Sequence, residues 1–230
     1  MTAIFVSATG TDVGKTFVTA GLVRHLLKDG SAVDAIKPVV SGFDPAAIEA
    51  SDPGALLAAL GRPLTIEEAE RISPWRFAAP LSPDMAARRE GRAIDFGAVT
   101  DFCRAAMAAR RGHLFVEGIG GIMVPLDQSR TVLDLITQLR IPLLLMTGTY
   151  VGTISHALTA LQILTRRNLD VAAVIVSESQ GSAASLDDTV ATIARFSDSI
   201  DVVGIPRLAD AATADAATAH PAFAAIAQLL

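Results

Sequence analysis

Apolar runs and stretches of helical periodicity alternate along most of this chain of 230 residues. Six runs of aliphatic and β-branched residues predict strands at 4–8, 33–40, 114–118, 142–148, 171–177 and 201–206. The runs are almost continuously apolar, which is typical of strands buried on both faces of a parallel sheet. The pattern therefore predicts an α/β fold with a mostly parallel β-sheet flanked by helices on both faces.

Helical patterns fill the intervals between the predicted strands. Apolar residues recur at fourfold spacing from Val18 to Leu26, and similar patterns begin at Val132 and Ile154. Their placement between strands fits the crossover helices of a parallel sheet. Further helical patterns occur at 53–61, 65–72, 96–110 and 222–230.

The domain organisation follows from length and local composition. A chain of this length predicts one domain over residues 1–230. The segment 44–95 holds most of the prolines and the only Trp, so we expect an insertion over one edge of the sheet. Residues 209–230 form a C-terminal tail rich in Ala, Thr and Asp.

Charge and composition limit the kinds of partner and the cellular location that we expect. The net charge of −5 provides no basic surface, so we expect no nucleic-acid partner. The N-terminal residues lack a signal-peptide pattern, which predicts a cytoplasmic location. The uncharged stretch 141–164 is interrupted by Pro142, glycines and His156, so it predicts a strand and a helix with no membrane partner. Cys103 is the single cysteine and has the pattern of a core residue.

The stretch "ATGTDVGKT" at 8–16 joins the first predicted strand to the first predicted helix. Such a Gly-rich turn directs backbone N–H groups and a helix N-terminus at an anion. Lys15 would reach the β- and γ-phosphates, and the Thr16 hydroxyl would ligate Mg²⁺. The usual spacing puts a glycine at position 9, where this chain has Thr9 and places Gly10 next. A plain tight turn with a surface lysine is the alternative, although the flanking strand and helix favour phosphate binding.

Three charged residues near strand ends are candidates for the same site. Lys37 lies inside the predicted strand 33–40, where its charge is costly unless it meets an anion or snorkels to water. Glu117 ends another predicted strand and is a candidate Mg²⁺ ligand. Asp52 is a second candidate ligand, with a helix cap or turn as its alternative role.

With these residues assembled, the chain resembles the dethiobiotin synthetases, whose fold is that of the P-loop NTPases. The family's loop reads "GTDTxVGKT", so Ala8 replaces its first glycine. Further matches are "KPVVSG", "SPDMAARREGR", "VEGIGG" and "GTYVGTISHAL". Three positions depart from the family: Asp84 replaces a His, Ser155 replaces an Asn, and Ser177 stands where an Asn often holds adenine.

The resemblance implies an ATP-dependent ligase of biotin biosynthesis. Its substrate 7,8-diaminopelargonate takes up CO₂ as a carbamate, ATP phosphorylates the carbamate, and the second amine closes the ureido ring. The cofactor implied is Mg²⁺, and the partners implied are these small molecules and a second copy of the chain, with the site completed across the homodimer. The helix start at Gly152 to Ser155 is the candidate contact, because helix N-termini attract carboxylates. An internal crossover helix is its plainer interpretation.

The motifs and the resemblance together assign overlapping sets of residues. The catalytic set is Lys37, Lys15 and Thr11. The nucleotide-binding set is Gly10, Thr11, Asp12, Val13, Gly14, Lys15, Thr16, Phe17, Ser177 and Pro206. The substrate-binding set is Lys37, Ser41, Gly118, Ile119, Gly120, Gly152 and Ser155. The metal-binding set is Thr16, Asp52 and Glu117.

Other P-loop proteins offer competing interpretations. ATPase switches of the MinD or ParA kind carry a second lysine early in the loop, and no lysine precedes Lys15 here. Cobyrinate amidotransferases need a glutaminase domain with a nucleophilic cysteine, for which this chain has no room. A bare nucleotide-binding module is the remaining alternative.

Overall fold

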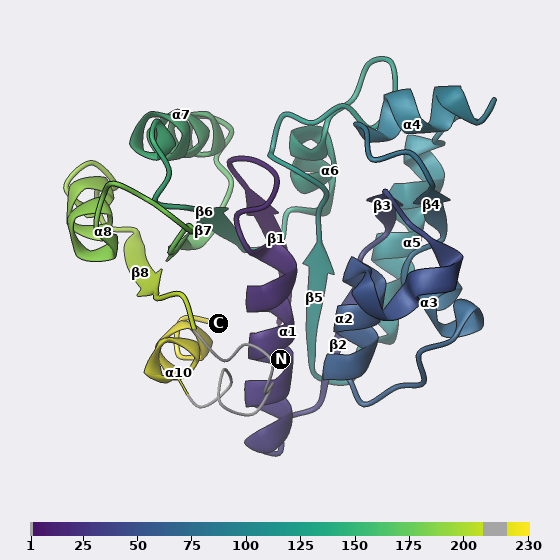
Figure 1. Ribbon diagram of the computed structural model, residues 1–230, viewed down its shortest axis with the longest axis horizontal. Helices are drawn as coiled ribbons and strands as arrows, with labels where there is room; N and C mark the ends of the chain where they lie inside the picture. The colour runs from purple at the N-terminus through teal and green to yellow at the C-terminus, as the bar shows by residue number, and fades with distance from the viewer. Residues whose placement is uncertain (1, 209–219) are drawn as a thin grey trace.

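The computed structural model describes residues 2–208 and 220–230. Its main sheet has six strands, and every neighbouring pair is parallel (Figure 1). The strands are β1 (Ala3–Ala8), β2 (Val33–Ile36), β5 (His113–Glu117), β6 (Leu143–Thr147), β7 (Val171–Ser177) and β8 (Asp201–Ile205). The predicted fold class is confirmed.

The strand order places the site. The order across the sheet is β2-β5-β1-β6-β7-β8, so the chain leaves β1 toward one side and later crosses from β5 to β6 on the other. Connections diverge at the carboxyl end of β1, and ligands of open α/β sheets bind in such a crevice. The loop after Ala8 lies at this point.

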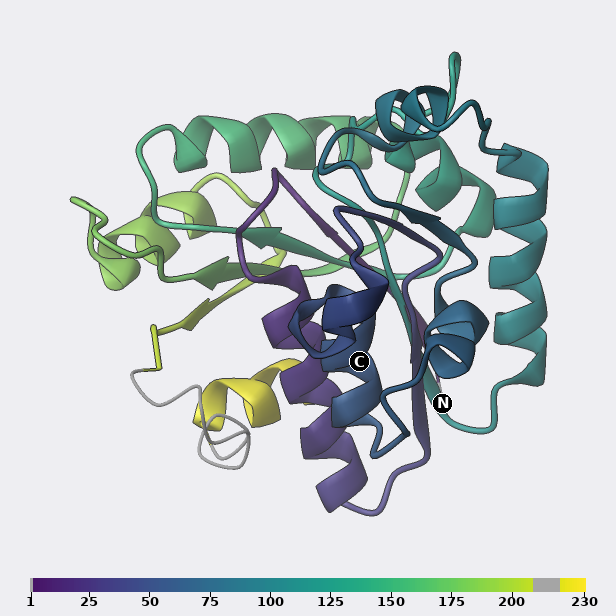
Figure 2. The ribbon, with the colours of Figure 1, turned by 45° about the vertical axis from the view of Figure 1, so that its right-hand side comes forward.

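Helices cover both faces of the sheet (Figure 2). One face carries α1 (Lys15–Lys28) and α10 (Pro221–Ala227), which contact each other. The opposite face carries α5 (Phe96–Ala109), α6 (Val132–Leu139), α7 (Thr153–Arg166) and α8 (Leu186–Ala194). No helix within residues 2–208 or 220–230 has the length and apolar character that a membrane crossing requires.

The predicted strand 33–40 is wrong in its extent, because β2 ends at Ile36. Pro38 has no N–H to donate to a ladder, so the chain leaves the main sheet there. It continues as β3 (Val39–Ser41), which pairs in parallel with β4 (Trp75–Phe77) in a second sheet of two strands. Lys37 therefore lies beyond the end of a strand, at the carboxyl edge of the main sheet.

Most of the rest of the segment 44–95 is helical (Figure 1). Its elements are the 3₁₀ helix η1 (Pro45–Ala50) and the helices α2 (Asp52–Ala59), α3 (Ile66–Ile72) and α4 (Pro83–Arg89). The helix α4 lies near β3 and β4. The helix α2 contacts both α1 and β2. Its start is fixed by Ser51, whose hydroxyl accepts a hydrogen bond from the Gly54 N–H at 3.1 Å. This start positions Asp52.

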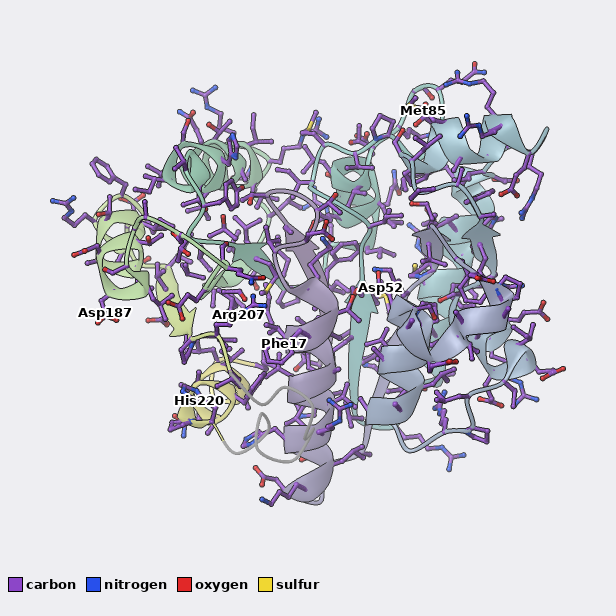
Figure 3. All side chains as sticks on the ribbon, viewed as in Figure 1. Phe17, Asp52, Met85, Asp187, Arg207 and His220 are labelled. Atoms are coloured by element: carbon purple, nitrogen blue, oxygen red, sulfur yellow. The ribbon has the colours of Figure 1, made fainter. Side chains whose placement is uncertain are left out.

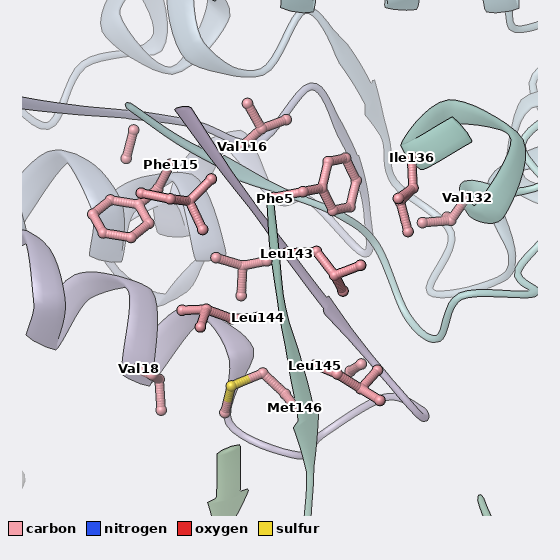
Figure 4. Packing of buried hydrophobic residues seen from close by; sticks show 14 of the residues in the cluster. Phe5, Val18, Phe115, Val116, Val132, Ile136, Leu143, Leu144, Leu145 and Met146 are labelled. Atoms are coloured by element: carbon pink, nitrogen blue, oxygen red, sulfur yellow. The ribbon is translucent and has the colours of Figure 1, made fainter. Parts of the chain in front are cut away.

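The core lies between the sheet and its helices (Figure 4). Phe5, Phe115 and the run from Leu143 to Met146 are fully buried on the three central strands. Cys103 on α5 is also fully buried, and burial raises the pKa of its thiol to about 12. It is therefore a core residue, as its position in the sequence predicted.

The C-terminal helix α10 packs on the helix that follows the phosphate-binding loop. A Cβ atom at Gly21 of α1 would lie 2.3 Å from the Phe223 ring, so the ring occupies space that only glycine leaves. The ring also makes an edge contact with Phe17, with the ring centroids 6.2 Å apart. The helix predicted near the end of the chain is confirmed as α10, whereas residues 209–219 of the predicted tail lie outside the described residues.

Candidate active site

The loop between β1 and α1 has the form of an anion cradle. Asp12 and Gly14 both adopt left-handed backbone conformations, with φ of 57° and 84°. Gly14 precedes the first residue of α1, so the positive end of the helix dipole faces the cleft. Lys15 is 7 % exposed, and its Nζ donates to the Gly10 carbonyl oxygen at 3.0 Å.

Lys37 is at the centre of a cluster of charges that is buried except at Asp52, whose side chain is 46 % exposed. Its Nζ lies 2.7 Å from Asp52 Oδ2 and 2.7 Å from Glu117 Oε1. Lys37 is 2 % exposed, so it does not snorkel to water, and Glu117 is fully buried. A buried ammonium needs partners of this kind, because an unpaired one would cost several kcal/mol, on the order of 3–5. The structure thus brings together three charged residues that the sequence placed at separate strand or helix ends.

These contacts shift the pKa values of the cluster. Burial alone would lower the pKa of Lys37, but the carboxylates of Glu117 and Asp52 raise it above its ordinary value. Burial opposes ionisation of Asp52 as well, yet the nearby Lys37 ammonium lowers its pKa. Lys15 behaves differently: burial and the nearby Lys37 charge lower its pKa to about 8. Lys37 thus stays charged near neutral pH, whereas Lys15 titrates in the mildly alkaline range.

The metal-binding residues proposed from the sequence lie in this cluster. The Thr16 hydroxyl donates to Glu117 Oε1 at 2.6 Å, so loop, strand and helix meet there. The other carboxylate oxygen, Glu117 Oε2, is buried and has no hydrogen-bond partner among the described residues. Two carboxylates, a hydroxyl and an unpaired buried oxygen suit a hard cation such as Mg²⁺, which takes one or two carboxylates plus phosphate oxygens. Across the described residues, no group of three or more His, Cys, Asp or Glu forms a separate metal site.

A cleft of about 850 Å³ opens in front of these groups. Eleven of its lining residues belong to the predicted site: Thr11, Asp12, Gly14, Lys15, Thr16, Phe17, Lys37, Ser41, Asp52, Ile119 and Gly120. The prediction missed a second wall, formed by Pro80, Leu81, Ser82 and Pro83 together with Val40, Gly42 and Val124. The signal for this wall was the stretch "SPDMAARREGR", but its position over the cleft depends on the pairing of β3 with β4.

Other predicted site residues lie around or behind the loop. Val13 is buried, and the Gly118 carbonyl oxygen lies 3.5 Å from Lys37 Nζ. Ser177, at the end of β7, touches the loop, since a Cβ atom on Gly14 would lie 2.9 Å from its Oγ. Pro206 follows β8 and is not among the residues that line the cleft. Its neighbour Arg207 and Asp52 lie on opposite sides of the start of α1 (Figure 3).

Two predicted substrate-binding residues do not reach this cleft within one chain. Gly152 precedes the first residue of α7, and both it and Ser155 are exposed. Ser155 instead lines a groove of about 520 Å³ between α7 and the segment 196–200 that follows α8. Beside them, Val151 is 90 % exposed.

Comparison with known proteins identifies relatives over most of the chain. A family model described as an AAA domain matches residues 2–214. An ATP-dependent dethiobiotin synthetase BioD from Caulobacter sp. (strain K31) is 48 % identical over 90 % of this chain and 89 % of the relative. The protein of the same name from Acidiphilium cryptum (strain JF-5) is 46 % identical over 77 % of this chain and 80 % of the relative.

Solved structures with the same fold are much more distant in sequence. The cell division protein MinD of Aquifex aeolicus, in its complex with MinC, has a TM-score of 0.60 at 14 % identity, over 100 % of this chain and 93 % of that one. A ParA family ATPase from Chlorobium tepidum TLS has a TM-score of 0.54 at 12 % identity, over 94 % and 88 %. At such identities the likeness shows the P-loop NTPase fold alone.

Proposed function

Because the chain belongs to the family of ATP-dependent dethiobiotin synthetases, we propose that its cleft closes the ureido ring of dethiobiotin. The substrates are 7,8-diaminopelargonate, CO₂ and ATP, and the products are dethiobiotin, ADP and phosphate. One observation carries the assignment to this cleft: Lys15 of the phosphate loop and the buried Lys37 line the same opening. Two cations at one opening suit a reaction in which an anionic carbamate meets a triphosphate.

The reaction divides into three steps. One amine of the substrate attacks CO₂ and loses a proton, which leaves a carbamate. A carbamate oxygen then attacks the γ-phosphorus, and the bond to the bridging oxygen breaks with ADP as the leaving group. The second amine attacks the carbonyl carbon of this mixed anhydride, phosphate leaves with the electron pair of the C–O bond, and the amine loses its proton.

The phosphate loop would hold the nucleotide. The N–H groups of Thr11 to Thr16 and the start of α1 would bind the β- and γ-phosphates, and Lys15 Nζ would exchange its bond to the Gly10 carbonyl for a phosphate oxygen. Thr11 faces the same cleft. Anionic oxygens would raise the pKa of Lys15 from its low starting value, so nucleotide binding favours the charged lysine.

Lys37 would bind the carbamate and stabilise charge on the transferring phosphoryl group. Its Nζ is held by two carboxylates, so the ammonium is oriented before any substrate arrives. Ser41 and the backbone of Gly118 to Gly120 would position the amine end. No residue needs to act as a nucleophile, because carbamate and amine both belong to the substrate, and catalysis then consists mainly of positioning and charge stabilisation.

Thr16, Asp52 and Glu117 would hold Mg²⁺. The cluster of two carboxylates with one hydroxyl, and the unpaired Glu117 Oε2, support this assignment. When bound, the ion would neutralise charge on the phosphate oxygens.

We further propose that the site is completed by a second copy of the chain. Gly152 and Ser155 are exposed at the start of α7, away from the cleft of their own chain, and the neighbouring Val151 is 90 % exposed. A helix N-terminus suits the carboxylate tail of the substrate. Ser155→Asp would repel that tail and raise the KM for the diamine about tenfold, with the ATP Kd unchanged. An unchanged KM, or a monomer in light scattering at assay concentration, would refute the shared site.

Release of phosphate tests the function directly. The purified protein is incubated with ATP, Mg²⁺ and bicarbonate, with and without diaminopelargonate, and phosphate and dethiobiotin are measured. We expect both products only when the diamine is present, in equal amounts. Steady phosphate release that ignores the diamine would point to an ATPase switch of the MinD kind and contradict the proposal.

A further inference from the structure

An uninterrupted chain of hydrogen bonds joins the turn before α7 to the phosphate loop. His156 Nδ1 lies 3.0 Å from the Tyr150 hydroxyl oxygen, which lies 3.2 Å from Thr9 Oγ1. Thr9 Oγ1 is 3.0 Å from Thr147 Oγ1, and Thr147 Oγ1 is 2.7 Å from Thr153 Oγ1. The chain ends where the Thr153 hydroxyl donates to the Gly148 carbonyl oxygen at 2.7 Å.

The carbonyl at its end fixes the direction of this chain. A carbonyl oxygen only accepts, so Thr153 uses its single hydrogen on Gly148 and must accept from Thr147. By the same rule Thr147 accepts from Thr9, and Thr9 accepts from Tyr150. The Tyr150 hydrogen is then used, so its oxygen can only accept a hydrogen from His156.

Every link has a hydrogen only when Nδ1 of His156 is protonated, and only one of the two neutral tautomers meets this condition. Nδ1 must carry a proton, which leaves Nε2 as the acceptor when the ring is neutral. The opposite tautomer would make Nδ1 an acceptor, turn the Tyr150 hydrogen toward the ring, and leave Thr9 and Tyr150 facing each other with two lone pairs at 3.2 Å. The hydrogen-bond chain therefore requires a hydrogen on Nδ1 of His156.

Thr9, a middle link of the hydrogen-bond chain, lies at the entry of the phosphate loop. Thr9 follows β1 directly, and its N–H donates to the Met146 carbonyl oxygen at 2.9 Å. On its other side, the Thr9 carbonyl lies where a Cβ atom on Gly121 would approach within 2.9 Å. The hydroxyl chain adds a third restraint from β6 and α7. Fixing a loop in its binding conformation lowers the ordering cost of binding.

We propose that Tyr150 and His156 are positioning residues for the phosphate loop, acting through Thr9, with His156 held as the Nδ1–H tautomer. The proposal rests on the proposed function only in that the loop binds nucleotide phosphates. It assigns a role to a tyrosine and a histidine that are not among the residues lining the cleft.

The protein contains a second histidine, His220, that serves as a reference for the tautomer of His156. His220 caps α10, and its Nδ1 accepts a hydrogen bond from the Ala222 N–H at 3.2 Å. Nδ1 of His220 therefore has a lone pair, and its hydrogen is on Nε2 when the ring is neutral. The two histidines should carry opposite tautomers in one spectrum.

Long-range ¹H–¹⁵N NMR of the full chain, labelled at histidine, measures the tautomers without any nucleotide. When both rings are neutral, we expect Nδ1–H for His156 and Nε2–H for His220. Tyr150→Phe removes the acceptor, and the His156 signals should then move toward those of His220. A wild-type spectrum with Nε2–H at both residues would overturn the assignment, whether or not the protein is a synthetase.

Calorimetry with ATP and Mg²⁺ tests the positioning. Loss of one hydrogen bond at the loop entry should weaken ATP binding about three- to tenfold in Tyr150→Phe and in Thr9→Val. Thr9→Ser and His156→Asn keep a hydroxyl and an N–H near the original atoms, so they should stay within about twofold of wild type. Equal affinities for Thr9→Val and Thr9→Ser, or a normal affinity for Tyr150→Phe, would overturn the positioning role.

Discussion

The two ends of the sheet's carboxyl edge are built in different ways. At β2, β5 and β1 the site is built on two buried charges, and Glu117 Oε1 accepts from Lys37 Nζ at 2.7 Å and from the Thr16 hydroxyl at 2.6 Å. At β7 and β8 the polar groups are uncharged or partly exposed. There the Ser177 hydroxyl lies against Gly14 of the phosphate loop, and Glu178 accepts from the backbone N–H of Arg207 at 2.8 Å.

This difference indicates which part of the site tolerates substitution least. A buried charge without its partner is costly, so the cluster around Lys37 tolerates few geometries and few substitutions. A half-exposed hydroxyl can exchange its partner for water at little cost. We therefore expect substitutions to have effects that fall steeply from the Lys37 end to the Ser177 end.

Lys37→Ala should have the largest effect. It removes the ammonium that we assign to the carbamate, so kcat should fall about 100-fold or more. It also leaves the buried Glu117 carboxylate without its closest cation, which should lower the free energy of unfolding by about 3–5 kcal/mol. Rate assays and chemical denaturation measure the two effects.

The control for this change is Lys28→Ala, in the exposed last turn of α1, which should alter neither quantity. Lys37→Gln keeps more of the packing and serves if the alanine variant fails to fold. Near-normal turnover in a folded Lys37 variant would contradict the expectation that the Lys37 end of the site is more sensitive to substitution than the Ser177 end.

Nucleotide affinity should depend on pH through Lys15. Its pKa in the folded protein is about 8 against 10.5 for an ordinary lysine. Between these values the unfolded state binds more protons than the folded state, so this group makes the protein more stable as pH rises through that window. ATP binding has the opposite dependence, because it needs the charged lysine. Titration calorimetry at pH 7, 8 and 9 should show affinity falling up to about tenfold per pH unit above 8.

Lys15→Arg separates this effect from other titrations. Arginine stays charged throughout this range, so the variant should lose the dependence above pH 8 even if its affinity is lower overall. A wild-type affinity that stays constant from pH 7 to 9 would contradict the role of Lys15.

Ser177→Asn should have the smallest effect and would sharpen the comparison. An amide offers a donor and an acceptor together, which one hydroxyl cannot match for a purine or pyrimidine edge. We expect the preference for ATP over CTP and GTP, as ratios of kcat/KM, to increase about five- to tenfold. Ser177→Ala should change these ratios less than about twofold. A large loss of kcat in either Ser177 variant would mean that the Ser177 end is as sensitive to substitution as the Lys37 end.

Much of the fold was predictable because most strands of the main sheet can be recognised in the sequence. β1, β5, β6, β7 and β8 lie within about one residue of the predicted runs, since buried parallel strands are continuously apolar. The break after Ile36 was not predictable from hydrophobicity, because residues 38–40 remain apolar after the chain changes sheets. α4, α8 and β4 were missed because their short, mixed patterns give no clear period.

The candidate site divides in the same way. Lys15 and Thr16 belong to a local motif, so one stretch of sequence places them. The meeting of Lys37, Asp52 and Glu117 needs strand order and the start of α2, which no local pattern contains. The link from Thr9 to Tyr150 and His156 spans β1, β6 and α7, and no local sequence pattern connects these residues.

The packing of the Phe223 ring against Gly21 of α1 has a consequence for when α1 becomes fully packed during protein synthesis. About 200 residues separate the two positions, and at 5–20 residues per second this distance takes roughly 10–40 s to translate. The helix behind the phosphate loop is thus synthesised long before α10, and it gains its contact with Phe223 only after α10 has left the ribosome. A nascent chain that stalls before α10 would carry the nucleotide motif on an incompletely buried helix.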